Sequence, residues 1–171
     1  MFDEPNRLAS LVAAQDQAAT LFAAAQGAGL LRAGVSESQL SQEIHDLAAA
    51  QFGVTTHWHR KVVRAGANTV ATFYENPPET VLGEDDIVFL DLGPVFGTWE
   101  ADYGRTFVLG DDPEKHRLVA DLDAVWAELA GLWRTRPQIT GAELYAAAQR
   151  AAVARGWRFA GQIAGHLVGE F

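Results

Sequence analysis

Asp91 and Asp102 are the two residues of this chain whose type and spacing best suit metal chemistry. Asp91 closes an apolar run, and Asp102 follows after a turn-like segment. Carboxylates held close together repel each other, and burial adds to the cost unless a cation or a shared proton compensates. One divalent ion, or two bridged ions, would supply that compensation. The other interpretation is a surface hairpin with two solvated acids, but the apolar flanks favour a functional pair.

Two predicted strands position these carboxylates. Residues 87–92 are nearly all apolar, residues 98–108 alternate large and polar side chains, and glycines mark the turn between them. If the hairpin centre lies directly before Gly97, Asp91 and Asp102 stand opposite each other with their Cβ atoms roughly 4.5–5.5 Å apart. The sequence therefore predicts a facing pair of carboxylates.

Helical patterns surround the hairpin. Ser36 and Thr140 each begin a capping-box pattern, and Pro113 stands at the favoured first position of a helix. The predicted helices cover approximately residues 5–31, 36–51, 112–133 and 140–156.

The two pairs of predicted helices resemble each other in sequence. Residues 28–32 match residues 130–134, the two capping boxes match, and Gly53 corresponds to Gly156, at a steady offset of 102 to 104 residues. Matches in the same order at a steady offset suggest an internal duplication of a helix–helix–strand unit.

The duplication predicts the domain organisation. We expect one domain over residues 1–171, with a first half of about 1–110 and a second half of about 111–171. Because 15 residues follow Gly156, the second half is expected to be incomplete in the sequence as given.

The composition narrows the class of protein. The 171 residues are 49% hydrophobic, which suffices for one domain with a core, and no apolar run approaches the roughly 18 residues of a membrane span. The N-terminus lacks the pattern of a signal peptide, so we expect a cytoplasmic protein.

Cysteine is absent, so a metal site must use carboxylates and imidazoles. The net charge of −9 disfavours nucleic acid and anionic membrane as partners.

Three of the five histidines occupy positions that could serve a site. The same-face spacing of His57 and His59 on a strand is compatible with a metal pair, although a pocket wall or plain surface is the simpler interpretation. His166 lies in a Gly-His-x-x-Gly sequence, where glycines let another group approach the backbone closely. We interpret His45 and His116 as surface or helix-packing residues.

The order of these motifs resembles a family of metallopeptidases. The hairpin around Asp91 and Asp102, followed by Gly-His-x-x-Gly at His166, is similar to that of methionine aminopeptidases, Xaa-Pro aminopeptidases, prolidases and creatinase. Residues 64–69 and 83–87 resemble the segments before the hairpin. The resemblance implies the α+β pita-bread fold, in which pseudo-twofold related halves surround a mainly antiparallel sheet. The internal duplication is what that fold would produce.

The resemblance also implies a site for two divalent ions, held by two aspartates, one histidine and two glutamates. In this sequence Asp91 would chelate one ion, Asp102 would bridge both, and His166 would bind the second. The ions are Mn, Co, Zn or Fe, which the sequence does not distinguish. A metal-bridged hydroxide would attack the scissile carbonyl, with a glutamate as general base.

The sequence departs from the family pattern in two places. Both glutamates follow the Gly-His motif in the family, so we expect the general base beyond Phe171 and assign no catalytic residue within the chain. The family's substrate-contacting histidine before the hairpin falls near Thr72 or Phe73, and neither is a histidine. His57 and His59 are the candidate substrate-binding substitutes.

Three functional hypotheses follow. The first is a metal-dependent hydrolase that removes N-terminal residues or cleaves Xaa-Pro peptides and dipeptides. The alternative is an inactive pita-bread module that binds a peptide, a protein or a metal. The third is a metal-free α/β domain with a solvated acidic hairpin. The expected partner is a peptide or small amide substrate, with no nucleic acid and no membrane, and a homodimer is left open.

Overall fold

A computed structural model describes residues 4–161 and 165–171. The described residues group into two compact units, of which one comprises the chain up to Gly110 together with Val168–Phe171, and the other comprises Asp111–Leu167. That these units form a single domain stays a prediction. Among the described residues, no helix is both long and apolar enough to cross a membrane.

The first unit contains α1 (Glu4–Gly27), α2 (Glu37–Phe52), β1 (Val62–Ala65), the short 3-10 helix η1 (Gly66–Val70), β2 (Ile87–Leu92), β3 (Val95–Phe96), β4 (Trp99–Glu100) and β5 (Tyr103–Val108). The second unit contains α3 (Pro113–Thr135) and α4 (Gly141–Ala154).

Capping residues set the helix boundaries, as the sequence predicts. The side chain of Ser36 accepts a backbone hydrogen bond at the start of α2, and Gly53, with φ of 67°, ends that helix. Asp112 caps α3. Thr140 and Glu143 form a complete capping box at the start of α4. The predicted helix starts are therefore confirmed, and each unit repeats a helix–helix pair.

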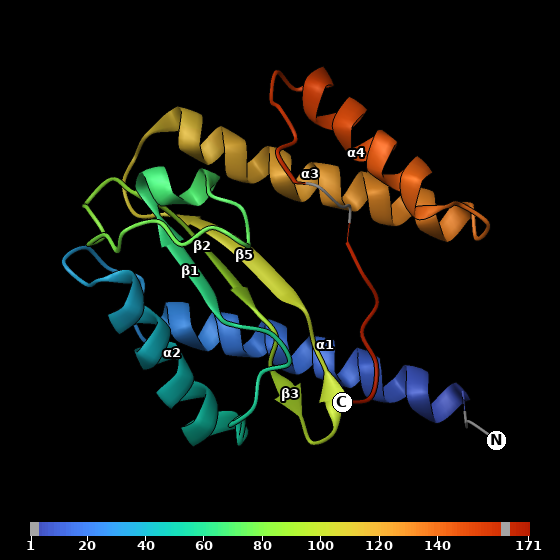
Figure 1. The fold of residues 1–171 in the computed structure, drawn as a ribbon, viewed down its shortest axis with the longest axis horizontal. Coiled ribbons are helices and arrows are strands. Elements are labelled where there is room, and N and C mark those ends of the chain that lie inside the picture. Colours follow the sequence, from blue (N-terminus) through green and yellow to red (C-terminus); the bar gives the residue numbers. More distant parts are fainter. Residues whose placement is uncertain (1–3, 162–164) are drawn as a thin grey trace. The chain divides into compact units, whose positions relative to one another are not determined.

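Three antiparallel strands form the sheet of the first unit in the order β1-β2-β5, and α1 and α2 pack against one face of it (Figure 1). Side chains alternate between the two faces of a strand, so Val88, Leu90 and Leu92 of β2 are buried in the core formed with the helices. The core also includes Phe22, Ala25, Leu40, Ile44, Val63 and Ala65. The opposite face of β2 carries Phe89 and Asp91.

The hairpin register differs from the predicted one by two residues. Asp91 pairs with Gly104 rather than with Asp102, and the hairpin centre lies between Gly97 and Thr98. Gly97 has φ of 64°, and glycine at the first central position of a two-residue loop is typical of a type II′ turn. The prediction that the two carboxylates stand directly opposite each other is therefore wrong. Because a shift of two residues preserves the alternation of side chains, both carboxylates stay on the same face of the hairpin.

The predicted strand over residues 98–108 is interrupted in the structure. It divides into β4, which pairs with β3, and β5, which pairs with β2. Asp102 lies in the break between β4 and β5, so its carboxylate is carried by a short connection rather than by a regular strand.

Residues 168–171 add an outer segment to β4. Gly169 accepts a hydrogen bond from the backbone N–H of Glu100 at 3.0 Å and donates one to the Glu100 carboxylate at 2.8 Å. The N–H of Phe171 donates to the carbonyl of Thr98 at 2.8 Å. The last described residues of the chain therefore belong to the first unit.

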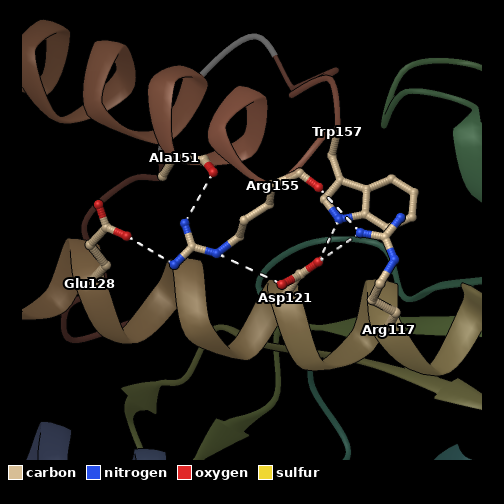
Figure 2. Close-up of polar contacts among 6 residues, drawn as sticks. All are labelled: Arg117, Asp121, Glu128, Ala151, Arg155 and Trp157. Carbon is tan, nitrogen blue, oxygen red and sulfur yellow. Dashed lines mark hydrogen bonds and ion pairs between the residues drawn. The ribbon is translucent and has the colours of Figure 1, made fainter.

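A polar network joins α3 to α4 within the second unit (Figure 2). The carboxylate of Asp121 accepts a hydrogen bond from the indole N–H of Trp157 at 2.7 Å and pairs with Arg117 at 3.3 Å and Arg155 at 3.8 Å. The guanidinium of Arg117 stacks on the Trp157 ring, 4.1 Å from its centroid, and Arg155 also pairs with Glu128 at 3.1 Å. Asp121 is thus the acceptor that holds the segment after α4 on α3.

Candidate metal centre

Asp91 lies on β2, on the face of the sheet that points away from α1 and α2. Its neighbours on the adjacent strands are Val62 of β1 and Gly104 of β5. Because Gly104 has no side chain, the space beside the Asp91 carboxylate on the β5 side is open.

Asp102 reaches the same region from the connection before β5. The preceding residue, Ala101, donates a backbone hydrogen bond to Pro94 at 2.9 Å, and the following residue, Tyr103, pairs with Leu92. Asp102 therefore stands across from Gly93, diagonally to Asp91. Diagonal neighbours on one face lie within reach of each other's side chains, so the two carboxylates can act together.

A segment before β1 brings His59 to the carboxylates. The backbone N–H of Trp58 donates to the carbonyl of Gly93 at 2.9 Å, and its indole N–H donates to the carbonyl of Ala101 at 2.9 Å. These bonds lay His59 directly over Gly93. A Cβ atom on Gly93 would lie 2.4 Å from Cδ2 of His59, so the imidazole position requires glycine there.

His59, Asp91 and Asp102 form a compact group of metal-capable side chains. Nε2 of His59 lies 3.8 Å from Oδ1 of Asp91 and 3.8 Å from Oδ1 of Asp102. One ligand atom from each residue lies within 4.8 Å of the others. The His59 side chain is 11% exposed, against 37% for Asp91 and 29% for Asp102. The group is therefore half-buried, with its carboxylates facing solvent.

The electrostatics of this group favour a cation. Burial lowers the pKa of His59, but its polar contact with Asp102, its hydrogen bond with the backbone carbonyl of Arg60 and the charges of both aspartates outweigh burial, so the pKa is raised above 6.5. The negative potential that favours a proton on His59 also favours a metal ion.

The donor chemistry fits the ions that the resemblance implies. Imidazole nitrogen suits Zn, Co and Fe, and carboxylate oxygen suits Mn as well. One nitrogen donor and two carboxylates on adjacent backbone segments can therefore hold a divalent ion.

The other candidate residues, His57 and His166, have different immediate neighbours. His57 packs against His45, with ring centroids 5.8 Å apart, and its Nε2 is buried without a hydrogen-bond partner. Burial, together with the nearby charges of Lys61, His45 and His59, lowers the pKa of His57 to about 4. His166 belongs to the second unit, where it lines an apolar groove, so its assignment as a metal ligand stays a prediction.

Two contributions to the site could not be read from the sequence. In the sequence, Gly93 belongs to a Gly-Pro pair that indicates only a turn. In the structure, the imidazole of His59 packs directly against the Gly93 backbone. Trp58 carries no motif, yet its indole hydrogen bond fixes the segment that presents His59. Both roles depend on contacts between residues far apart in the chain.

Phe73 lies at the edge of the group. Its ring centroid is 6.0 Å from that of His59, and 41% of the residue is exposed. The guanidinium of Arg60 stacks on the Phe73 ring, 4.6 Å from its centroid. A partly exposed aromatic ring therefore lies beside His59.

Comparison with known proteins identifies the class. The profile of metallopeptidase family M24 matches residues 9–171. The chain belongs to this family.

Two curated relatives are similar to part of the chain. A Xaa-Pro dipeptidase of Lactobacillus delbrueckii subsp. lactis is 27% identical over 129 residues, which is 75% of this chain and 34% of the relative. A putative Xaa-Pro aminopeptidase of Mycoplasma genitalium is 27% identical over 111 residues, which is 64% of this chain and 31% of the relative. The chain thus spans about a third of the length of these relatives.

Solved structures share the fold. The X-Pro aminopeptidase of Thermotoga maritima superimposes with a TM-score of 0.74 at 18% identity, covering 98% of this chain and 46% of that chain. The prolidase of Thermococcus sibiricus gives a TM-score of 0.68 at 20% identity, covering 89% and 40%. Zinc-substituted aminopeptidase P of E. coli gives 0.64 at 22% identity, covering 85% and 33%. The predicted α+β pita-bread fold is therefore confirmed for the part of it that this chain spans.

Proposed function

We propose that this chain is part of a metal-dependent peptidase that removes N-terminal residues or cleaves Xaa-Pro peptides and dipeptides. The observation that carries the proposal is the convergence of Asp91, Asp102 and His59 on one face of the hairpin, with ligand atoms within 4.8 Å of one another. Membership of a metallopeptidase family and the names of the two curated relatives support it.

In this proposal Asp91 and Asp102 hold divalent ions, two in the complete site, and His166 is the ligand of the second ion. When bound, such ions lower the pKa of a coordinated water and polarise the scissile carbonyl. The hairpin fixes both carboxylates on one face, so they are positioned before an ion arrives. We assign no general base among the described residues.

Substrate recognition in this proposal involves the border of the site. Phe73 offers an apolar ring surface near His59, which suits the ring of a prolyl residue or another apolar side chain. His59 contacts both this ring and the carboxylates, which supports a role in substrate binding as well. His57 stays a candidate with less support, because its Nε2 is buried beside His45.

The first experiment compares metal binding by the chain and by its Asp102→Asn variant. Isothermal titration calorimetry with Mn²⁺ should show binding to the wild type and none to Asp102→Asn, because the amide keeps the shape of the side chain but removes its charge. Asp123→Asn, an exposed substitution on α3, is the matched control and should bind normally. Unchanged Mn²⁺ binding by Asp102→Asn would refute the assignment of Asp102 as a metal ligand.

Hydrolysis separates the enzyme from its alternative. Release of proline from a dipeptide such as glycyl-proline in the presence of Mn²⁺ supports a peptidase. Because this chain spans about a third of its relatives' length, the hydrolysis assay uses the protein that the complete reading frame encodes. Ion binding without hydrolysis of dipeptides or longer peptides by that protein supports the inactive binding module instead. The cytoplasmic location and the homodimer stay expectations.

A further inference from the structure

We infer that His59 is a third protein ligand of the ion held by Asp91 and Asp102. This inference rests on the proposed function, because it requires the two aspartates to bind metal. The five-ligand set implied by the family resemblance has no position for His59, which lies before the first strand of the sheet. The first unit alone would then offer three donors to one ion.

The position of the imidazole is the first argument. Nε2 of His59 is at the same distance, 3.8 Å, from a carboxylate oxygen of each aspartate. His59 is also the least exposed member of the group, at 11%. His59 would bind the ion from the protein interior, and the two carboxylates would bind it from positions nearer to solvent. The solvent side of the ion would then stay open for a substrate.

The orientation of the imidazole is the second argument. Nδ1 of His59 lies 2.6 Å from the backbone carbonyl of Arg60, and a carbonyl only accepts hydrogen bonds, so Nδ1 is the donor. Metal-binding histidines characteristically donate their second N–H to a carbonyl or carboxylate, which fixes the tautomer. In the neutral ring, the lone pair is then on Nε2, the atom that faces Asp91 and Asp102.

The packing around the ring is the third argument. The Trp58 ring contacts the imidazole edge-on, with centroids 4.5 Å apart. On another side the imidazole lies so close to the Gly93 backbone that a Cβ there would be 2.4 Å from its Cδ2. Arg60, whose carbonyl accepts from His59, is anchored by a hydrogen bond from its guanidinium to Asn76 at 2.6 Å. The imidazole is therefore held in one orientation before any ion binds, which reduces the entropic cost of binding.

A structural ion pair is the competing interpretation. A protonated His59 would itself be the cation that compensates the two aspartates, and it would then not bind a metal. The two interpretations differ in what happens when Mn²⁺ is added. An ion pair contributes no nitrogen donor to the ion, whereas a ligand does.

The test measures Mn²⁺ affinity by calorimetry in four chains: the wild type, His59→Gln, His59→Glu and the control His116→Gln on α3. We expect His59→Gln to weaken binding by at least roughly tenfold, the scale of losses seen even for residues that only orient metal ligands. His59→Glu keeps a donor group and should recover most of the affinity, and His116→Gln should bind like the wild type. Normal affinity of His59→Gln, or equal losses in the Gln and Glu variants, would overturn the inference.

A spectroscopic measurement decides the case even if the His59 variants fail to fold. Pulsed electron paramagnetic resonance of Mn²⁺ bound to a His166→Gln chain should show coupling to an imidazole nitrogen, and the absence of that coupling would refute a His59 ligand. Loss of Mn²⁺ binding in Asp102→Asn with normal binding in His59→Gln would leave the proposed function intact and remove this inference alone. No Mn²⁺ binding by the wild type would remove both.

Discussion

At the scale of residues, the candidate centre depends on Gly93 as well as on its donors. Gly104 stands beside Asp91 and Gly93 stands across from Asp102. A side chain at either position would point to the face that carries the carboxylates. Of the two positions, only residue 93 would bring an added Cβ against His59, 2.4 Å from its Cδ2, so Gly93 is part of the site although it carries no chemistry.

Gly93→Ala tests this interpretation. The added methyl would lie 2.4 Å from Cδ2 and 2.7 Å from Nε2 of His59, a separation that forces the imidazole away from the carboxylates. We expect Mn²⁺ affinity to fall about as far as in His59→Gln, measured by the same calorimetric titration.

The matched control is Gly104→Ala. Its Cβ would meet only the carbonyl of Leu90, at the ordinary distance of 3.5 Å, so the affinity for Mn²⁺ should stay close to that of the wild type. Equal losses in both variants would show that any methyl on this face disturbs the site, and the specific role of Gly93 would be wrong.

At the scale of elements, the hairpin shows what a sequence can and cannot specify. The apolar run of 87–92 predicts β2 with its bounds, because a buried strand must be apolar at nearly every position. The register was predicted two residues from its true value because the centre was placed before Gly97 rather than after it. The Gly97-Thr98 pair is the local signal that would have corrected it, because glycine at the first central position is typical of a type II′ turn, and the structure gives Gly97 the required positive φ.

The metal-capable group was only partly predictable for a physical reason. Asp91 and Asp102 are brought together by a local hairpin, so their shared face follows from alternation alone. The approach of His59 depends on the bonds that Trp58 makes to Gly93 and Ala101. Such contacts between distant segments leave no periodic pattern in the sequence.

The α3–α4 pair provides a stability prediction at the same scale. Asp121→Ala removes the acceptor of the Trp157 indole N–H and the partner of two arginines (Figure 2). Leaving a partly buried donor unsatisfied costs about 1–3 kcal/mol. We expect the free energy of unfolding to fall by that amount in urea titrations followed by tryptophan fluorescence.

Glu128→Ala is the control for this prediction. Glu128 is 55% exposed and pairs with Arg155 at 3.1 Å, and exposed ion pairs contribute only about 0–1 kcal/mol. A loss in Glu128→Ala as large as that in Asp121→Ala would mean that the network acts through surface charge rather than through the indole hydrogen bond.

At the scale of the whole molecule, the three proposed donors His59, Asp91 and Asp102 belong to the first unit. An ion that binds only the folded state stabilises it by about 2.7 kcal/mol at a concentration one hundred times its dissociation constant. For a chain of this size, that corresponds to a rise in melting temperature of roughly 5–10 °C. Mn²⁺ should therefore raise the melting temperature measured by differential scanning calorimetry.

Asp102→Asn is the reference for this thermal experiment. Its melting temperature should be insensitive to Mn²⁺, because the ion then lacks one of its carboxylate ligands. A similar rise in the variant would locate ion binding elsewhere on the acidic surface. No rise in the wild type at millimolar Mn²⁺ would count against a competent site in this chain.

The pairing of residues 168–171 with β4 has a consequence for the timing of folding. A ribosome adds roughly 5–20 residues per second, so about 70 residues, or some 4–14 seconds of synthesis, separate Glu100 from the segment that bonds to it. During that interval the outer edge of β4 has no strand beside it, and open strand edges are sites of association with other chains. The shortness of β4, only Trp99–Glu100, limits how much edge a nascent chain exposes while it waits.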